Sequence, residues 1–500
     1  MTDYLLGLDS GLTVTKAVMF CTDGSVVASA KREIPQIKER ARHVERDMEA
    51  HWNASAEAIR EALHLAAETE GCEVQPLALS VAGHGDGVYL LDEQGRPLGL
   101  AATSLDSRAQ QVVEGWDAKG VSARSLALTG QEPFPASPAA ILAHIRDAEP
   151  RRFGQIAAIQ SCKDWLRYCL TGEIATDFTE ASVAFTDVRT QRYSDEALAL
   201  FGLQDLTGAL PPVIMPDAVA GHVSGKAARM TGLRAGLPVA AGLHDVTACA
   251  VGSGVIAPGT IAVIAGTYSI NEMLMDRPET SAGWYARNGL MPGQWMNMSI
   301  SPASSANLDW FLRQSARDAL AQGDPFRELQ RELDAVAGDP SDIVYLPYLF
   351  GSPHRADVAG AFLGLRGWHH RGHMLRAVAE GIVFNHRHHV DLLDPDHRTD
   401  RVRLTGGSSR NPYFCQLFAD VLDRRIEIPA TQEAGALGVA ICAGLACGAY
   451  DDWHDAISRT QSDARIFEPG AGRAQVEEAW QRYRRVAAEM VRFEERQANE

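Results

Sequence analysis

The sequence predicts an α/β fold with mixed sheets, arranged as two similar halves. Three strand-like segments at the start are followed by alternating helix and strand patterns, which is typical of α/β architecture. A second series of strands and helices follows in the latter half in a similar order. The 500 residues also exceed what one hydrophobic core usually organises. We therefore expect two domains, residues 1–252 and residues 253–500, divided at a Gly- and Pro-rich stretch at 252–259.

The first elements form a predicted antiparallel meander. Apolar, β-branched runs indicate strands, and Ser10-Gly11 supplies the first turn between them. Apolar residues at helical spacing then indicate an amphipathic helix. The expected strands are residues 4–9, 15–21, 25–34 and 77–81, and the expected helices are residues 47–70 and 106–116.

The second half repeats this logic. Two strand-like runs precede a long helix, and a further strand then alternates with helices. The expected strands are residues 260–275, 290–300 and 402–404, and the expected helices are residues 369–392, 411–422 and 433–448. The six histidines in and beside the first of these helices have no carboxylate or thiol pattern around them, so we do not assign them to a metal.

Composition excludes several classes of partner. A formal net charge of −17 with no basic stripe argues against nucleic acid and anionic membranes. The eight cysteines are scattered without a C-x-x-C pair, and the N-terminus lacks a signal-peptide pattern. We expect a cytoplasmic protein whose partner is a small molecule, and we leave a homodimer open.

Two Gly- and Thr-rich hairpins are the most informative motifs. The first runs from Asp9 through Gly11 and Thr13 to Lys16, and the second contains Gly266 and Thr267. Glycine permits close approach of a ligand, and the hydroxyl and N–H groups suit phosphate oxygens. Each hairpin alone is more often an ordinary turn. Together they would form a polyphosphate clamp.

Asp245 lies between an apolar strand and a helix. One interpretation is an N-cap. The other is a carboxylate at the carboxyl edge of a sheet, where α/β proteins bind ligands. There it could orient a hydroxyl and accept its proton. We expect the helix dipole to keep it ionised, and the role does not need a raised pKa.

Three further segments carry two interpretations each. Asp9 is either a turn former or a carboxylate that holds Mg²⁺ through water. The loop at residues 83–87 offers His84 and Asp86 either to a turn or to a polyol near Asp245. Gly406 and Gly407, with Asn411 at a helix start, form either a plain βα turn or an adenosine surface.

These motifs resemble those of the FGGY carbohydrate kinases, in the same order and over nearly the whole chain. The most diagnostic block is Lys163 to Glu173, continued by Thr176-Asp177 and Ala181-Ser182. Leu12 and Tyr268 depart from the smaller residues usual in the two phosphate loops. The resemblance implies the actin-like ATPase (ribonuclease-H-like) fold, with two domains and a cleft between them, and ATP and Mg²⁺ as cofactors.

The resemblance also implies roles for individual residues. Asp245 becomes the catalytic base, and Asp9 holds Mg²⁺ through water. The implied ATP and phosphate contacts are Asp9, Gly11, Thr13, Lys16, Gly266, Thr267, Gly406, Gly407 and Asn411. The implied substrate contacts are His84, Asp86, Asp106, Arg108 and His244. For Asp106 and Arg108, a helix start with a local ion pair is an equal alternative.

The motifs at residues 83–87 and 266–272 are most similar to the L-xylulose, xylulose and erythritol kinase branch. We expect ATP-dependent phosphorylation of a terminal hydroxyl of a ketopentose of the xylulose type. The alternatives are erythritol, another polyol or glycerol as acceptor. An alternative from a different class is an actin-like ATPase without sugar kinase activity.

Overall fold

The computed structural model describes residues 3–315, 325–354, 358–461 and 464–499. The chain forms two compact units that interleave along the sequence. Unit 1 comprises Met1–Pro258, Leu274–Asn297 and Glu433–Ser462, and unit 2 comprises Gly259–Met273, Met298–Gln432 and Asp463–Glu500. The two predicted domains are consecutive segments of the chain, whereas the two units interleave. The division into domains at residue 252 stays a prediction.

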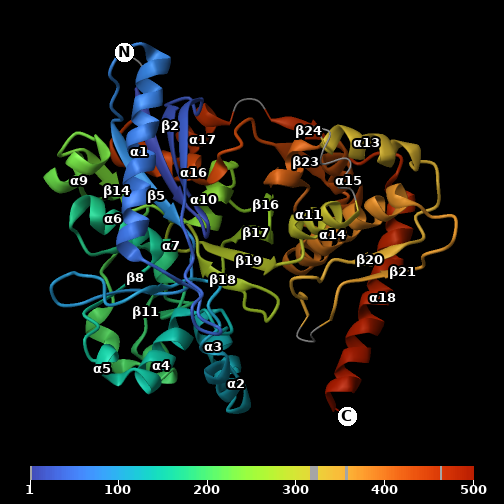
Figure 1. The fold of residues 1–500 in the computed structure, drawn as a ribbon, viewed down its shortest axis with the longest axis horizontal. Helices are drawn as coiled ribbons and strands as arrows, with labels where there is room; N and C mark the ends of the chain where they lie inside the picture. Colours follow the sequence, from blue (N-terminus) through green and yellow to red (C-terminus); the bar gives the residue numbers. More distant parts are fainter. Residues whose placement is uncertain (1–2, 316–324, 355–357, 462–463, 500) are drawn as a thin grey trace. The chain divides into compact units, whose positions relative to one another are not determined.

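Unit 1 is built on a mixed seven-stranded sheet with the order β13-β14-β5-β1-β2-β3, and β15 pairs with β5 (Figure 1). The pairs β1–β2 and β2–β3 are antiparallel, which confirms the predicted meander, whereas β5 is parallel to β1. Both β14 and β15 run parallel to β5. The strands are β1 (Tyr4–Ser10), β2 (Val14–Cys21), β3 (Val26–Glu33), β5 (Ala78–Gly83), β13 (Val219–His222), β14 (Pro238–Ala240) and β15 (Leu243–His244).

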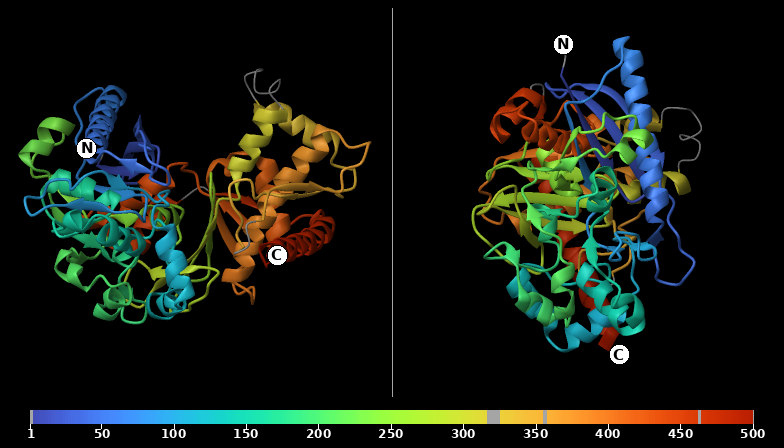
Figure 2. Two further views of the ribbon diagram at one scale, coloured as in Figure 1. Left: turned by 60° about the horizontal axis from the view of Figure 1, so that its bottom comes forward. Right: turned by 90° about the vertical axis from the view of Figure 1, so that its left-hand side faces the viewer.

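Both faces of this sheet are covered by helices. Alternate side chains of a strand point to opposite faces, so Leu6 and Leu8 pack in the core beneath α1 (Met48–Glu70), whereas Leu5 packs on α16 (Ala434–Ala446). Asp47 caps α1 by accepting a hydrogen bond from the Ala50 N–H. Figure 2 shows α1 beside the first strands in both of its views. The carboxyl ends of β1, β5 and β15 are thereby fixed at one edge of the sheet.

Unit 1 has further elements, some of which pack around a smaller core that includes Val88, Ile141 and Phe185. The predicted helix at 106–116 begins later, because residues 103–106 form a turn in which the Asp106 N–H donates to the Thr103 carbonyl. These elements are β4 (Glu45–Arg46), β6 (Tyr89–Leu91), β7 (Ala101–Ala102), α2 (Gln110–Ala118), α3 (Val121–Thr129), α4 (Pro138–Ala148), α5 (Pro150–Phe153), β8 (Ala158–Gln160), α6 (Cys162–Thr171), β9 (Thr176–Asp177), α7 (Phe178–Ala181), β10 (Thr186–Asp187), β11 (Arg192–Tyr193), α8 (Asp195–Leu200), β12 (Val213–Ile214), α9 (Gly225–Thr231), α10 (Asp245–Gly252), β18 (Tyr285–Asn288) and α17 (Trp453–Thr460).

Unit 2 repeats the strand order of unit 1. Its strands neighbour one another as β19-β17-β16-β22-β23-β24. The β16–β17 hairpin is antiparallel, β22 is parallel to β16, and β23 is parallel to β22. The strands are β16 (Ile261–Ala265), β17 (Ser269–Met275), β19 (Trp295–Ser301), β22 (Arg401–Thr405), β23 (Arg425–Ile428) and β24 (Arg465–Phe467). The sequence prediction that both halves use one α/β plan is confirmed.

One long buried helix, α14 (Arg371–Leu393), is central to the helices of unit 2 and packs on several of them. The other elements are α11 (Ser305–Ser315), α13 (Pro325–Ala335), β20 (Val344–Leu346), β21 (Ala361–Leu363), α15 (Pro412–Leu422) and α18 (Arg473–Asn499). Within the described part of the chain, no helix combines the length and the apolar character needed to span a membrane.

Candidate active site

The turn of the first hairpin presents backbone amides. The last pair of the β1–β2 ladder is Ser10 with Thr15. The Gly11 N–H donates to the Val14 carbonyl at 3.0 Å, which closes the turn. Among the described residues, no group accepts from the N–H of Leu12 or of Thr13, and Thr13 is exposed. The turn therefore offers two adjacent N–H donors to an anion.

Asp9 lies immediately before this turn, on β1. A Cβ on Gly435 would lie 2.5 Å from Asp9 Oδ2, so the glycine lets the carboxylate reach the first turn of α16. Burial raises the pKa of Asp9 to about 6, and Lys16 opposes that rise. Lys16 Nζ lies 2.7 Å from Glu433 Oε2. The predicted phosphate ligand Lys16 is thus held by an ion pair beside Asp9.

Asp245 is the first residue of α10, directly after β15. His244 occupies the N-cap position, and Asp245 Oδ1 instead accepts a hydrogen bond from the Val246 N–H at 2.7 Å. Burial raises the pKa of Asp245 to about 7, and the charge of Asp9 adds to the rise. The expected effect of the helix dipole, which favours the ionised form, is opposed here by desolvation and by a second carboxylate.

The loop at residues 83–87 begins where β5 ends, beside the first hairpin. The His84 N–H donates to the Ser10 carbonyl at 3.0 Å. His84 is 3% exposed, and its Nε2 lies 3.2 Å from the Tyr89 hydroxyl. Burial lowers the pKa of His84 to about 3, so the ring is neutral near pH 7. Asp86 has a φ of 58°, a conformation that few non-glycine residues adopt.

Arg287 joins two of the predicted substrate residues, and the sequence reading missed it. This side chain is buried, with Nη2 3.3 Å from Asp86 Oδ1 and Nη1 3.0 Å from His244 Nε2. Because a guanidinium can only donate, His244 Nε2 must accept, which leaves the proton on Nδ1. His244 Nδ1 is buried without a partner among the described residues. A Cβ on Gly85 would lie 1.9 Å from His244 Nε2, so only glycine fits there.

Asp106 and Arg108 are bonded to one another. Arg108 Nη2 lies 2.8 Å from Asp106 Oδ2 and 2.8 Å from Glu45 Oε1. Asp106 Oδ2 also accepts a hydrogen bond from the Val44 N–H at 2.8 Å. This geometry matches the local ion-pair alternative, and the assignment of both residues to the sugar stays a prediction.

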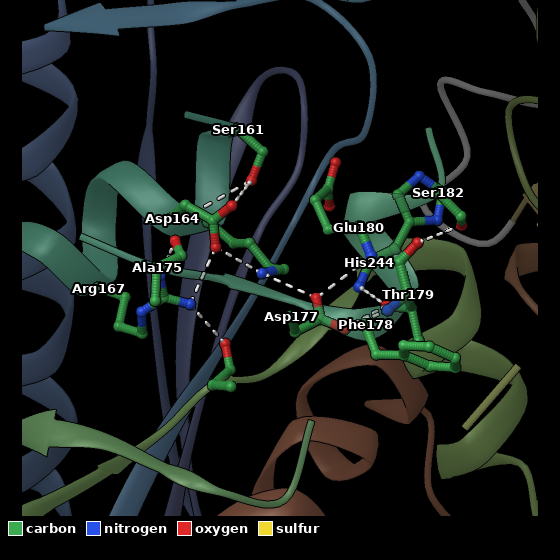
Figure 3. A network of polar contacts seen from close by, with 12 residues as sticks. Ser161, Asp164, Arg167, Ala175, Asp177, Phe178, Thr179, Glu180, Ser182 and His244 are labelled. Atoms are coloured by element: carbon green, nitrogen blue, oxygen red, sulfur yellow. Dashed lines mark hydrogen bonds and ion pairs between the residues drawn. The ribbon is translucent and has the colours of Figure 1, made fainter. Parts of the chain in front are cut away.

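A buried polar network explains the most diagnostic sequence block (Figure 3). Lys163 Nζ lies 2.6 Å from Asp164 Oδ1 and 2.9 Å from Asp177 Oδ1. The Thr179 hydroxyl donates to Asp177 Oδ2 at 2.7 Å and accepts from the His244 N–H at 3.1 Å. The network therefore reaches the residue that precedes Asp245. Sequence reasoning had singled out this block without giving it a role.

In unit 2, the predicted nucleotide residues gather at the ends of β16 and β22. A Cβ on Gly406 would lie 2.9 Å from the Gly266 nitrogen, so these two backbones are in close contact. Thr267 and Gly407 are exposed. Asn411 caps α15, because its Oδ1 accepts from the Tyr413 N–H at 2.8 Å. Gly266, Thr267, Gly406 and Gly407 thus share one edge of the unit 2 sheet.

This set of parts suits phosphoryl transfer. Two half-buried aspartates lie at the carboxyl edge of the unit 1 sheet. Beside them are a turn with two amides that have no acceptor in the described part of the chain, and a loop of neutral and charged hydrogen-bonding groups. A carboxylate with a pKa near 7 is suited to accept a proton from a hydroxyl. The fold and the site define the class of a phosphotransferase with an alcohol acceptor.

Family models give the more specific assignment. The N-terminal domain model of the FGGY family of carbohydrate kinases matches residues 4–252, and the C-terminal domain model matches residues 261–447. The chain belongs to the FGGY family of carbohydrate kinases, which are ATP-dependent phosphotransferases. The predicted family, fold class and enzyme class are confirmed, and the alternative of an ATPase without sugar kinase activity is set aside.

Individual relatives and structures agree with this assignment. The chain is 31% identical to a probable L-xylulose kinase of Haemophilus influenzae, over 93% of this chain and 94% of that protein. It is 29% identical to an erythritol kinase of Brucella abortus, over 91% and 90% of the two chains. The structure superposes on the crystal structure of a xylulose kinase from Rhodospirillum rubrum with a TM-score of 0.87 at 27% identity, covering 98% and 100% of the chains. These matches confirm the two-domain actin-like ATPase fold.

Proposed function

We propose that the protein phosphorylates a terminal hydroxyl of a ketopentose of the xylulose type, with ATP as donor and Asp245 as base. The observation that carries this proposal is the position of Asp245. Its carboxylate follows His244, whose ring contacts Arg287, and Arg287 in turn pairs with Asp86 of the 83–87 loop. A base and several groups that can bind hydroxyls therefore belong to one cluster.

Asp245 accepts the proton of the attacking hydroxyl. The acceptor oxygen forms a bond to the γ-phosphorus as the bond from that phosphorus to the bridging oxygen breaks, and ADP leaves. In a loose transition state the proton moves late, so a base with a pKa of about 7 is strong enough. The backbone of Val246 holds one oxygen of Asp245, which leaves the other for the hydroxyl.

Asp9 fits a role in holding Mg²⁺ through water. Burial raises the pKa of its half-buried carboxylate to about 6 although Lys16 opposes the rise, so a bound cation would favour the ionised form. Magnesium commonly binds one or two carboxylates together with substrate phosphates and waters. When bound, Mg²⁺ would neutralise charge on the transferred phosphates. The free amides of Leu12 and Thr13 would hold phosphate oxygens beside it.

Several polar groups support a polyhydroxy acceptor. Neutral His84, the Asp86–Arg287 pair and the unpartnered Nδ1–H of His244 offer both donors and acceptors. A site built to bind several hydroxyls rejects analogues that lack them. Similarity to a probable L-xylulose kinase supports a ketopentose. Similarity to an erythritol kinase makes erythritol the second candidate.

An acceptor panel tests the proposal. We expect ATP turnover to require added sugar, with kcat/KM highest for L-xylulose or D-xylulose, lower for erythritol and lowest for glycerol. His84→Ala should lower kcat/KM for the best sugar by about 10-fold while ATP affinity is unchanged, since it removes one hydrogen-bonding group. Erythritol or glycerol leading the panel would refute the ketopentose assignment.

A cytoplasmic location and a homodimer stay predictions. Size-exclusion chromatography with light scattering would test the second.

A further inference from the structure

Arg46 is a fully buried cation that forms no ion pair with a carboxylate among the described residues. Its side chain is 0% exposed. Within the described residues, no aspartate or glutamate forms an ion pair with it, whereas the equally buried Arg167 pairs with Asp164 at 2.9 Å. Arg46 Nε also lacks a hydrogen-bond partner among those residues. A buried charge is costly unless something compensates it, so Arg46 calls for a reason.

Its guanidinium instead contacts the first hairpin. Nη2 donates to the carbonyl oxygen of Leu12 and lies 3.5 Å from the carbonyl oxygen of Gly11. Nη1 donates to the Tyr89 hydroxyl at 3.3 Å. Arg46 therefore lies behind the turn, on the side to which the carbonyl oxygens of the turn point.

Because Arg46 holds these carbonyl groups, it also fixes the direction of the N–H groups in the same peptides. In a trans peptide, the C=O and the following N–H point in opposite directions. The carbonyls of Gly11 and Leu12 share their peptide planes with the N–H groups of Leu12 and Thr13. Since Arg46 holds those carbonyls on one side, the two N–H groups are directed to the other. These are the two amides of the turn that have no acceptor among the described residues.

The protein fixes Arg46 from three sides. It belongs to β4, which pairs with β7 in the register Arg46 to Ala101. The preceding residue, Glu45, is held by Arg108 at 2.8 Å. The Tyr89 hydroxyl that accepts from Arg46 also lies 3.2 Å from His84 Nε2. The guanidinium is thus set in place before any ligand arrives.

We propose that Arg46 is a positioning residue for nucleotide phosphate. It orients the peptides of residues 11–13 so that their N–H groups face the phosphates, and its unneutralised charge attracts the anion through the turn. Arg46 does not touch the phosphate itself, because its side chain is fully buried behind the turn. This inference rests on the proposed assignment of the turn to phosphate.

Titration calorimetry with Mg²⁺ and ADP tests it. For Arg46→Met we expect the Kd for ADP to rise by about 10–100-fold, the loss typical of a charged hydrogen-bonding group, while the KM for the best sugar changes less than about threefold. Arg46→Lys keeps the positive charge but loses the planar guanidinium with its several N–H donors. The Kd of this variant for ADP should therefore rise by about 3–10-fold. An unchanged Kd in either folded variant would overturn the proposal. Should Arg46→Met not fold, Arg46→Lys decides.

Two controls separate the causes. Arg424→Met removes a buried arginine of unit 2 that is neutralised by Asp394 at 3.0 Å, and it should leave the Kd unchanged even where stability falls. Thr13→Glu places a negative charge on the exposed turn and should weaken ADP binding by more than about 10-fold. If Thr13→Glu and Arg46→Met both leave the Kd unchanged, the phosphate assignment itself is wrong. If only Arg46→Met does, the positioning role alone is wrong.

Discussion

The two hairpins that we assign to phosphate have the same scaffold. In unit 1, the hairpin is anchored by His51 of α1, whose Nε2 lies 2.7 Å from Ser10 Oγ. In unit 2, it is anchored by His386 of α14, whose Nδ1 lies 3.1 Å from Ser269 Oγ. Each helix has 23 residues, and burial lowers the pKa of both histidines. Both rings are therefore neutral hydrogen-bonding supports.

The hairpins differ in the group that holds the turn carbonyls. In unit 1 a guanidinium, that of Arg46, donates to Leu12. In unit 2 the carbonyl of Gly266 accepts from the Ser305 N–H at 3.1 Å and from its hydroxyl at 2.6 Å. A carbonyl of the turn is thus held by a charged group in one unit and by neutral groups in the other.

The two units also differ in the carboxylates at the edge of the sheet. The sheet of unit 1 ends in Asp9 and Asp245, and the charge of Asp9 adds to the effect of burial in raising the pKa of Asp245. The corresponding edge of unit 2 ends in Gly266 and Gly406, which have no side chains. A repeated fold therefore separates two tasks. Under the proposed function, unit 1 carries the charged groups assigned to the reaction and to Mg²⁺, and unit 2 offers backbone surfaces.

The largest expected effect comes from removing the base. Asp245→Asn should lower kcat by about 10²–10⁴-fold, because proton acceptance is lost, while the Kd for ADP changes little. Asp195→Asn is the matched control, since Asp195 is also the first residue of a helix but is exposed. It should keep wild-type kcat. Wild-type turnover in Asp245→Asn would contradict the claim that unit 1 supplies the base of the reaction.

The same substitution should stabilise the protein at high pH. The folded pKa of about 7 exceeds the ordinary 3.8, so the folded state loses stability as pH rises from about 4 through 7. Neutral asparagine avoids this loss. We expect Asp245→Asn to gain about 1–3 kcal/mol in unfolding free energy at pH 8 and clearly less at pH 5. Equal gains in unfolding free energy at both pH values, measured by urea denaturation, would show that ionisation of Asp245 does not destabilise the folded protein.

A smaller loss should follow when the support of Asp245 is weakened. Thr179→Val removes the hydroxyl that accepts the His244 N–H, so we expect kcat to fall by about 5–20-fold as Asp245 shifts. The unfolding free energy should drop by about 1–3 kcal/mol, because a buried N–H loses its partner. Thr207→Val, at an exposed site in the same unit, is the control. Loss of stability with unchanged kcat would mean that the network supports the fold only.

The smallest effect is expected in unit 2. Ser305→Ala removes one of two neutral donors to the Gly266 carbonyl, so the Kd for ADP should rise by about 2–4-fold. The backbone N–H of Ser305 remains in place. A rise in the Kd for ADP as large as that of Arg46→Met would show that a charged group behind the turn contributes no more to ADP binding than a neutral one.

Local signals in the sequence predicted much of this site. The turn after Asp9, the loop with His84 and the strand-helix junction at Asp245 are each marked by neighbouring residues. Arg46 and Arg287 carry no such mark, because their partners lie far away in the chain: Leu12 for the first, and Asp86 and His244 for the second. The raised pKa of Asp245 could not be predicted from the sequence, because burial and the charge of Asp9 depend on tertiary packing. Lys16 likewise meets Glu433 only in the folded chain.

The pH dependence of turnover tests the role of Asp245 most directly. With saturating MgATP and the best sugar at subsaturating concentration, the account predicts that kcat/KM of the wild type rises about tenfold per pH unit below an apparent pKa near 7 and then levels off. Asp245→Asn should give a low rate without this ascending limb. A wild-type profile that is flat between pH 5 and pH 8, or an ascending limb retained in Asp245→Asn, would contradict the assignment of Asp245 as the base.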